Sequence, residues 1–209
     1  MPRSPLSAWL ADPALEQGLR DYADILGSTG VERGLIGPRE VDRLWERHIL
    51  NCAVVTEAVP RGTQVLDIGA GAGLPGLVWA LARPDLTVIC LEPLLRRATF
   101  LTETVSALGL TDRVEVIRGR AEDLARTGEL QAPVTTARAV APLERLAGWA
   151  LPLTSSGGEL LALKGSSAEA EVTAAAAAIT AAGGDEVSIE EFGSGIVDPP
   201  TRVVRIRKS

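Results

Sequence analysis

Short apolar runs alternate with longer amphipathic stretches through the middle of the chain. The runs predict buried strands at Gln64–Ile68, Leu86–Leu91, Val114–Arg118, Val134–Ala137 and Gly158–Leu163. Helices are expected between them over Gly76–Arg83, Leu94–Leu108 and Leu143–Leu151. Because strands and helices take turns along the chain, the pattern predicts an α/β fold with a parallel sheet and helices on both faces.

The two ends of the chain show different patterns. The N-terminal part predicts helices over Ser4–Leu10 and Ala14–Leu26, a loop over Gly27–Gly37, and a longer helix from Pro38 to Val59. At the other end an alanine-rich helix over residues 166–182 is expected, followed by an antiparallel pair of edge strands, Glu186–Phe192 and Arg202–Arg207. We therefore expect a helical N-terminal extension, residues 1–60, and an α/β domain, residues 61–209.

A glycine-rich stretch between the first strand and the next helix carries the strongest candidate chemistry. Gly69, Gly71 and Gly73 stand at alternate positions after Asp67, and Leu74-Pro75-Gly76 leads into the helix. Glycine is needed where the backbone takes a positive φ or comes close to a ligand. The stretch therefore predicts a ligand lying on the backbone and facing a helix N-terminus.

Two acidic residues help to identify this ligand. Asp67 ends the first strand, where it would repel a pyrophosphate and attract a cation such as S-adenosylmethionine. Glu92 ends the next apolar run, where a carboxylate can accept hydrogen bonds from both ribose hydroxyls. Glu92 supports an adenosine ligand of either kind, NAD or S-adenosylmethionine, and Asp67 favours the latter.

Other polar residues fall at the carboxyl ends of later strands, where ligands bind in parallel sheets. Glu122 belongs to the turn Gly119–Asp123, and it either meets an adenine or simply favours a helix N-terminus. Arg138 could meet a ligand carboxylate or an RNA phosphate, or form a surface ion pair. Lys164 closes the fifth strand and either contacts the substrate or simply keeps the strand end soluble. His48, on an apolar helix face, is read as a satisfied core residue.

Composition limits the possibilities further. The chain has 209 residues, 46% of them hydrophobic, and no apolar run long enough to span a membrane; the N-terminal residues lack an apolar signal segment. Two cysteines and one histidine provide no metal site and fit a reducing cytoplasm. The net charge of −6 argues against nucleic-acid binding but leaves room for a local basic patch.

These motifs together resemble a bacterial family, the guanine-N7 methyltransferases of small-subunit (16S) ribosomal RNA called RsmG or GidB. The matching stretches lie between about residues 45 and 165: Trp45-x-Arg47-His48-Ile49, Asp67 to Gly76, Arg97-x-x-Phe100-Leu101, Ala121-Glu122, Arg138-Ala139 and Leu163-Lys164-Gly165. The ending Gly-Leu-Pro-Gly is far more specific than a general glycine loop. One departure is Asn51, which stands where the family usually has an acidic residue.

The resemblance implies a class I (Rossmann-like) methyltransferase fold, a cytoplasmic enzyme and S-adenosylmethionine as cofactor. It also implies that Gly69, Leu74, Ala121, Glu122 and Arg138 contact S-adenosylmethionine. We expect a monomer that acts by positioning the guanine, with no general base. Alternatives are a methyltransferase for another RNA or a small molecule, a non-catalytic module that binds S-adenosylmethionine or a nucleotide, and an NAD-dependent reductase.

Overall fold

The computed structural model describes residues 12–209, so the expected helix Ser4–Leu10 lies outside the described residues. A seven-stranded sheet organises the fold, with strand order β3-β2-β1-β4-β5-β7-β6. The strands are β1 (Gln64–Ile68), β2 (Thr87–Leu91), β3 (Val114–Ile117), β4 (Ala132–Arg138), β5 (Thr154–Lys164), β6 (Gly184–Phe192) and β7 (Thr201–Lys208). All the strands expected from the sequence are present, most within two residues of the expected ends; the largest difference is at β5, which begins at Thr154.

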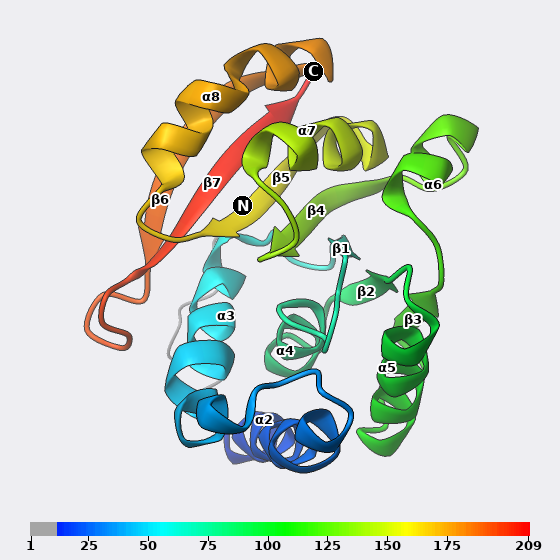
Figure 1. Cartoon of the computed structure of the whole chain (residues 1–209), viewed down its shortest axis with the longest axis vertical. Helices are drawn as coiled ribbons and strands as arrows, with labels where there is room; N and C mark the ends of the chain where they lie inside the picture. Colours follow the sequence, from blue (N-terminus) through cyan, green and yellow to red (C-terminus); the bar gives the residue numbers. More distant parts are fainter. Residues whose placement is uncertain (1–11) are drawn as a thin grey trace.

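The first five strands are parallel, whereas β7 pairs antiparallel with both β5 and β6. Strands β6 and β7 form the orange and red end of the sheet beside α8 (Figure 1). The expected antiparallel edge pair is confirmed, and β7 is inserted between β5 and β6. All five parallel strands therefore end at the same edge of the sheet.

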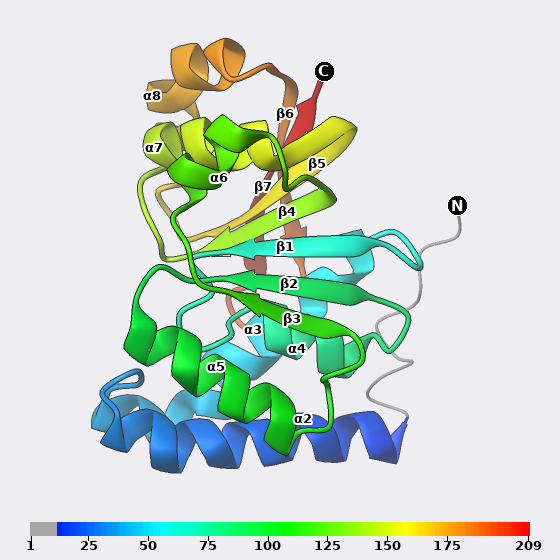
Figure 2. The ribbon, with the colours of Figure 1, turned by 90° about the vertical axis from the view of Figure 1, so that its right-hand side faces the viewer.

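Helices cover both faces of the sheet. Helices α2 (Pro13–Ile25), α4 (Gly76–Ala82) and α5 (Leu95–Ala107) pack on one face; α6 (Ala121–Thr127), α7 (Leu143–Ala150) and α8 (Ala168–Ala181) pack on the other. The first group lies in the lower part of Figure 2 and the second in the upper part. Successive residues of a strand point to opposite faces, so Val65 joins the first core and Leu66 the second.

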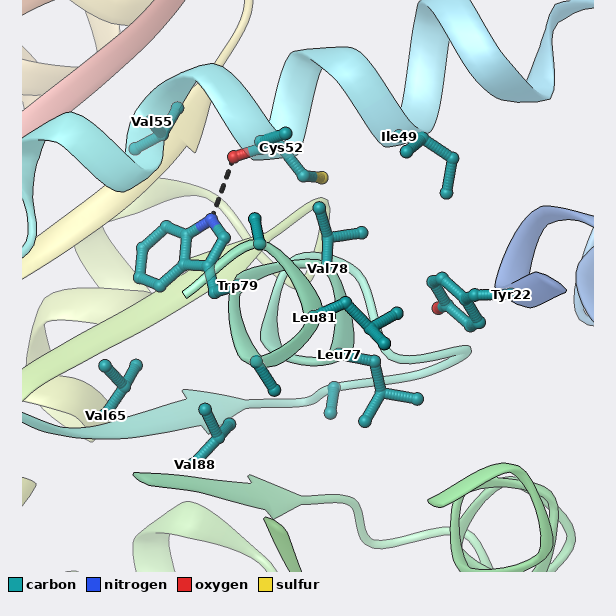
Figure 3. Close-up of a cluster of buried hydrophobic side chains, with 14 of the residues drawn as sticks. Tyr22, Ile49, Cys52, Val55, Val65, Leu77, Val78, Trp79, Leu81 and Val88 are labelled. Carbon is teal, nitrogen blue, oxygen red and sulfur yellow. Dashed lines mark hydrogen bonds between the residues drawn. The ribbon is translucent and has the colours of Figure 1, made fainter. Parts of the chain in front are cut away.

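The N-terminal segment, residues 12–60, shares the first of these cores. The indole Nε1 of Trp79 in α4 donates to the carbonyl oxygen of Cys52 at 2.9 Å, as Figure 3 shows. The guanidinium of Arg83, at the end of α4, donates to the carbonyl oxygens of Thr56 and Val59. Because Trp79 and Cys52 are fully buried, this segment is fixed against the sheet domain through packing as well as hydrogen bonds.

Two expectations for the N-terminal segment were wrong in detail. Helical backbone continues past α2 through η1 (Leu26–Gly30) to residue 32, where a loop was expected. The glycines lie inside this helix despite their low helix propensity; a Cβ on Gly27 would lie in ordinary van der Waals contact with Leu44, at 3.5 Å. The longer helix from Pro38 is present, but its hydrogen-bonding pattern changes along its length. It runs through a 3₁₀ helix η2 (Pro38–Arg43), a π-helix η3 (Leu44–Leu50), a short α-helix α3 (Asn51–Ala53) and a second 3₁₀ helix η4 (Val54–Ala58).

Helix α6 was not among the helices predicted from the apolar pattern, since its seven residues carry little of it, but it agrees with the interpretation of Glu122 as part of a helix N-terminus. No helix among residues 12–209 is both long and apolar enough to cross a membrane.

Candidate active site

The glycine loop, residues 69–76, joins β1 to α4 and needs its glycines for two reasons. Gly69, Gly71 and Gly73 all have positive φ angles, between 61° and 102°. Neighbouring atoms also leave no room for a side chain at two of them: a Cβ on Gly69 would lie 2.8 Å from Val140, and one on Gly73 would lie 2.8 Å from the hydroxyl oxygen of Tyr22. The loop is therefore held between β4 and the N-terminal helix α2.

Asp67 lies beneath this loop and is fully buried. Its Oδ2 accepts a hydrogen bond from the amide of Gly76 at 2.8 Å, at the start of α4, whereas its Oδ1 has no partner. Burial raises the pKa of Asp67 to about 7, and the nearby Glu92 contributes in the same direction. A buried carboxylate oxygen without a partner fits a ligand that brings a hydrogen-bond donor or a positive charge.

Glu92 follows β2 and is also buried, at 1% exposure. One carboxylate oxygen accepts from the amide of Gly71 at 3.0 Å and the other from the amide of Leu94 at 2.9 Å. A carboxylate has about four acceptor positions, so two remain for a ligand. Glu92 thus ties the glycine loop to β2 while keeping acceptor capacity for hydroxyl groups.

The turn after β3 lies against the same group. The amide of Gly119 donates to the carbonyl oxygen of Glu92 at 3.3 Å, and α6 starts two residues later. Ala121 is buried there and Glu122 is exposed, while Leu74 of the glycine loop is half-buried. The fold therefore gathers the residues predicted to bind the methyl donor, which we call the donor side, on neighbouring strand ends. Their contact with a cofactor stays a prediction.

Arg138 ends β4 and connects to the N-terminal segment. Its guanidinium donates to Nδ1 of His48 at 2.8 Å, to the carbonyl oxygen of Arg47 at 3.2 Å and to Sγ of Cys52 at 3.2 Å. His48 in turn contacts Glu40 through Nε2 at 3.0 Å. Both ring nitrogens of His48 are satisfied, as expected, but by charged residues at the edge of the site.

Lys164 ends β5 and is almost covered, with 10% of its side chain exposed. Its Nζ donates to the carbonyl oxygen of Ala141 at 2.9 Å and to Glu171 at 2.7 Å. Burial alone would raise the pKa of Glu171, but hydrogen bonds from Lys164, the Leu143 amide and Ser167 lower it. Lys164 thus holds the loop after β4 against α8.

An open cleft of about 1680 Å³ lies between the ends of β4 and β5, the N-terminal segment and the β6–β7 connection, and its lining residue Val140 lies next to Gly69 of the glycine loop. Its lining includes the basic residues Arg43, Arg47, Arg138, Lys164 and Arg202 and the acidic residues Glu46, Glu171, Glu191 and Asp198. Five cations against four anions give a lining charge of +1 (5 − 4), although the chain carries −6. The cleft is thus locally more positive than the rest of the molecule.

Sequence patterns did not assign the N-terminal residues to this site. Trp45 and Arg47 line the cleft, and Tyr22 donates from its hydroxyl to the carbonyl oxygen of Ala72 in the glycine loop at 2.7 Å. The only available signal was the motif Trp45-x-Arg47-His48, whose position on an apolar helix suggested packing. No cluster that could hold a metal ion occurs among the described residues.

Comparison with known proteins gives consistent matches. Residues 15–198 match the family model described as GidB, rRNA small subunit methyltransferase G. Curated relatives called ribosomal RNA small subunit methyltransferase G include one from Streptomyces coelicolor, 58% identical over 88% of this chain and 77% of its own. Another, from Salinispora tropica, is 54% identical over 90% of this chain and 79% of its own.

Solved structures show the same fold at low identity. Mitomycin 7-O-methyltransferase MmcR is 17% identical, with a TM-score of 0.61 over 96% of this chain and 70% of that one. Aeropyrum pernix fibrillarin, solved with bound S-adenosyl-L-methionine, is 14% identical, with a TM-score of 0.52 over 70% of this chain and 66% of that one. The expected methyltransferase fold is therefore confirmed.

Proposed function

The chain belongs to the GidB family, rRNA small subunit methyltransferase G, and on that premise we propose that it transfers a methyl group from S-adenosylmethionine to N7 of a guanine in 16S ribosomal RNA. One observation carries the proposal beyond family membership. The glycine loop rests on two buried acidic residues, Asp67 and Glu92, and the nearby cleft is locally basic. Arg138 lines the cleft and interacts electrostatically with Asp67, so a site for a cationic methyl donor adjoins a site for an anionic methyl acceptor.

On the donor side we assign the backbone of Gly69, Gly71 and Leu74 to the cofactor, with Asp67 and Glu92 beneath it. When bound, S-adenosylmethionine supplies an electrophilic methyl group on a positively charged sulfur. Asp67 fits this group because its Oδ1 is buried without a partner. Glu92 retains acceptor positions for the ribose hydroxyls.

Three further residues complete the donor side in this proposal. Ala121 and Glu122 follow the turn that lies against Glu92, where they would meet the adenine. Arg138 would hold the carboxylate of the cofactor, because a guanidinium offers paired donors to a carboxylate.

On the acceptor side the cleft has to position a base without removing a proton. Guanine N7 carries a free lone pair, so alignment with the methyl group is the main requirement. Trp45 lines the cleft; the guanidinium carbon of Arg20 lies 4.7 Å from its ring and covers one face, so a base would stack on the other face. Arg43 and Arg47 lie near it and can meet phosphates.

The RNA context follows from groove geometry. N7 faces the deep, narrow major groove of an RNA helix, which side chains cannot enter. We therefore expect the target guanine in a loop, in a distorted region or in a partly assembled subunit. We further propose that the enzyme acts in the cytoplasm as a monomer, with residues 43–51 of the N-terminal extension forming one wall of the acceptor site and residues 61–209 holding the cofactor.

The test uses small-subunit RNA from a strain in which the gene is deleted. The purified chain is incubated with methyl-labelled S-adenosylmethionine and either naked 16S RNA or whole small subunits. Label in one guanine, cleaved at N7-methylguanine by borohydride and aniline, is the expected result. Label at another nucleotide would refute the guanine-N7 assignment.

The same labelling assay, run on a cell extract that is then fractionated, separates the alternatives. Label transferred only in a small-molecule fraction of the cell extract would favour a small-molecule methyltransferase, for which the acidic net charge of −6 is the supporting observation. Binding of S-adenosylmethionine without transfer to any fraction would favour a non-catalytic module.

A further inference from the structure

The side chain of Arg138 is held from the N-terminal segment. Its acceptors are the imidazole of His48, the carbonyl oxygen of Arg47 and the thiol of Cys52, all neutral groups. The contact to His48, at 2.8 Å, is the shortest of the three. Neutral acceptors fix the orientation of a guanidinium while leaving its positive charge for another partner.

The contact determines the proton positions on His48. A guanidinium is always protonated and only donates, so Nδ1 of His48 has to carry a lone pair. Nε2 then carries the proton of the neutral ring and donates it to Glu40 at 3.0 Å. Glu40 and Arg138 therefore select one tautomer from opposite sides of the ring.

We propose that His48 is a positioning residue for Arg138: as the Nε2–H tautomer it accepts at Nδ1 and aims the guanidinium at the methyl donor. This role rests on the proposed function, because it gives Arg138 a ligand to hold. It also gives a reason for the N-terminal segment to pack on the sheet, since η3 supplies an acceptor that β4 and its neighbours do not.

Protonation of His48 would break this arrangement. A proton on Nδ1 would face a donor on Arg138, so the contact is lost when the ring becomes charged. The groups facing the ring are Glu40 from η2, Arg47 from η3 and Arg138 from β4. Burial, together with the two arginines, lowers the pKa of His48, whereas Glu40 opposes the shift. The neutral ring is thus maintained to below the ordinary value of 6.5.

The tautomer can be observed directly, because His48 is the only histidine in the chain. The full-length, untagged protein is labelled with ¹⁵N-histidine and examined by long-range ¹H–¹⁵N correlation at pH 7.5. We expect Nε2 to show the shift of a protonated ring nitrogen and Nδ1 that of an unprotonated one. A protonated Nδ1, in either a neutral or a charged ring, would overturn the proposal without reference to any ligand.

Two substitutions separate the two sides of the ring. In His48→Asn the side-chain oxygen can occupy the place of Nδ1 and accept from Arg138, but it cannot reach Glu40. In His48→Gln the amide reaches the place of Nε2 and keeps Glu40, but the acceptor for Arg138 is lost. We expect His48→Gln to bind S-adenosylhomocysteine about tenfold more weakly by calorimetry and His48→Asn to stay within about twofold of the parent.

Melting temperatures of both variants show whether folding is affected equally. Equal affinities for the two variants, whether both unchanged or both reduced, would mean that the acceptor at Nδ1 does not matter and would refute the proposal. If the parent chain itself does not bind S-adenosylhomocysteine, the proposed function fails, while the tautomer measurement still decides the arrangement of His48. The two failures are therefore distinguishable.

Discussion

The two sides of the candidate site are built in opposite ways. On the donor side, the glycine loop rests on the buried carboxylates of Asp67 and Glu92, and most contacts involve backbone amides. On the acceptor side, the cleft is open and its charged lining comes from long side chains such as Arg43 and Arg47, with Arg138 at the junction of the two sides. A rigid, acidic half thus adjoins an open, locally basic half.

The difference shows how the fold divides specificity. A small cofactor of constant shape suits a site made from backbone groups, which have few alternative positions. A large RNA needs a surface, and charged side chains can meet phosphates at several places. The two halves also differ in origin, because the donor side comes from the ends of three adjacent strands, β1, β2 and β3, and the acceptor side from four segments that range from the N-terminal segment to the β6–β7 connection.

Substitutions on the donor side should have larger effects than substitutions on the acceptor side. In Gly76→Ala the new Cβ would lie 2.7 Å from Oδ2 of Asp67, so the loop has to move and the buried hydrogen bond is lost. We expect a loss of roughly 3 kcal/mol in the free energy of unfolding and no detectable cofactor binding. Urea denaturation and calorimetry with S-adenosylmethionine measure the two effects.

Gly148→Ala is the matched control, because Gly148 is an exposed position in α7 with nothing within 4 Å of the added Cβ. It should raise stability slightly, by up to about 1 kcal/mol. Equal behaviour of the two alanine variants would show that close packing over Asp67 is unimportant.

The pKa of Asp67 should make stability depend on pH. The folded protein holds its proton to about pH 7, compared with an ordinary value of 3.8, so the folded state binds more protons between these values. Stability should therefore fall as the pH rises from about 4 to about 7, by roughly 2–4 kcal/mol from this group. In Asp67→Asn this part of the dependence should disappear from urea denaturation curves.

A bound cationic ligand should lower the pKa of Asp67. Positive charge near Asp67 favours the carboxylate, so binding of S-adenosylmethionine at pH 6.5 should release a fraction of a proton. Calorimetry in buffers with different ionisation enthalpies measures that fraction. If the parent chain and Asp67→Asn release the same number of protons, Asp67 does not face the positive charge of the cofactor.

The sequence predicted the donor side well for a physical reason. Positive φ angles, close packing and a strand-ending carboxylate all depend on residues next to one another, so Gly69, Gly71 and Asp67 leave a local signature. Short continuous apolar runs likewise predicted the parallel strands, because a strand that is buried on both faces needs apolar side chains at successive positions.

The acceptor side could not be predicted in the same way. Arg138 and His48 are 90 residues apart, and their hydrogen bond depends on how the N-terminal segment packs against α4 through Cys52 of α3. The polar use of His48 is hidden in the sequence by the apolar residues around it. The insertion of β7 beside β5 also has no local signal, since either edge strand has enough apolar residues to pair there.

Removing Arg138 tests the junction between the two halves. Arg138→Gln keeps a polar side chain but loses the charge, and we expect cofactor affinity to fall by about 10- to 100-fold with little change in the pH profile of transfer. Arg207→Gln, at an exposed position near the end of β7, is the control and should leave affinity unchanged. A bell-shaped pH–rate curve that is lost in Arg138→Gln would instead indicate acid–base chemistry.

The smallest effect should come from the pair behind the cleft, Lys164 and Glu171. Hydrogen bonds lower the pKa of Glu171, so the pair stabilises the fold above the ordinary pKa of about 4.3, and the gain is lost as the pH falls through the lower folded value. In a double-mutant cycle with Lys164→Met and Glu171→Gln we expect a coupling of about 1 kcal/mol at pH 7, measured by urea denaturation.

At a pH below the lowered pKa of Glu171 that coupling should be smaller, because protonated Glu171 no longer attracts Lys164. The pair ties the loop at Ala141 to α8, and only 10% of the Lys164 side chain is exposed. Lys164 should therefore affect RNA binding only through this loop, to the same extent in both single variants. A loss of RNA affinity in Lys164→Met alone, at unchanged stability, would move Lys164 from the frame of the cleft to its contact surface.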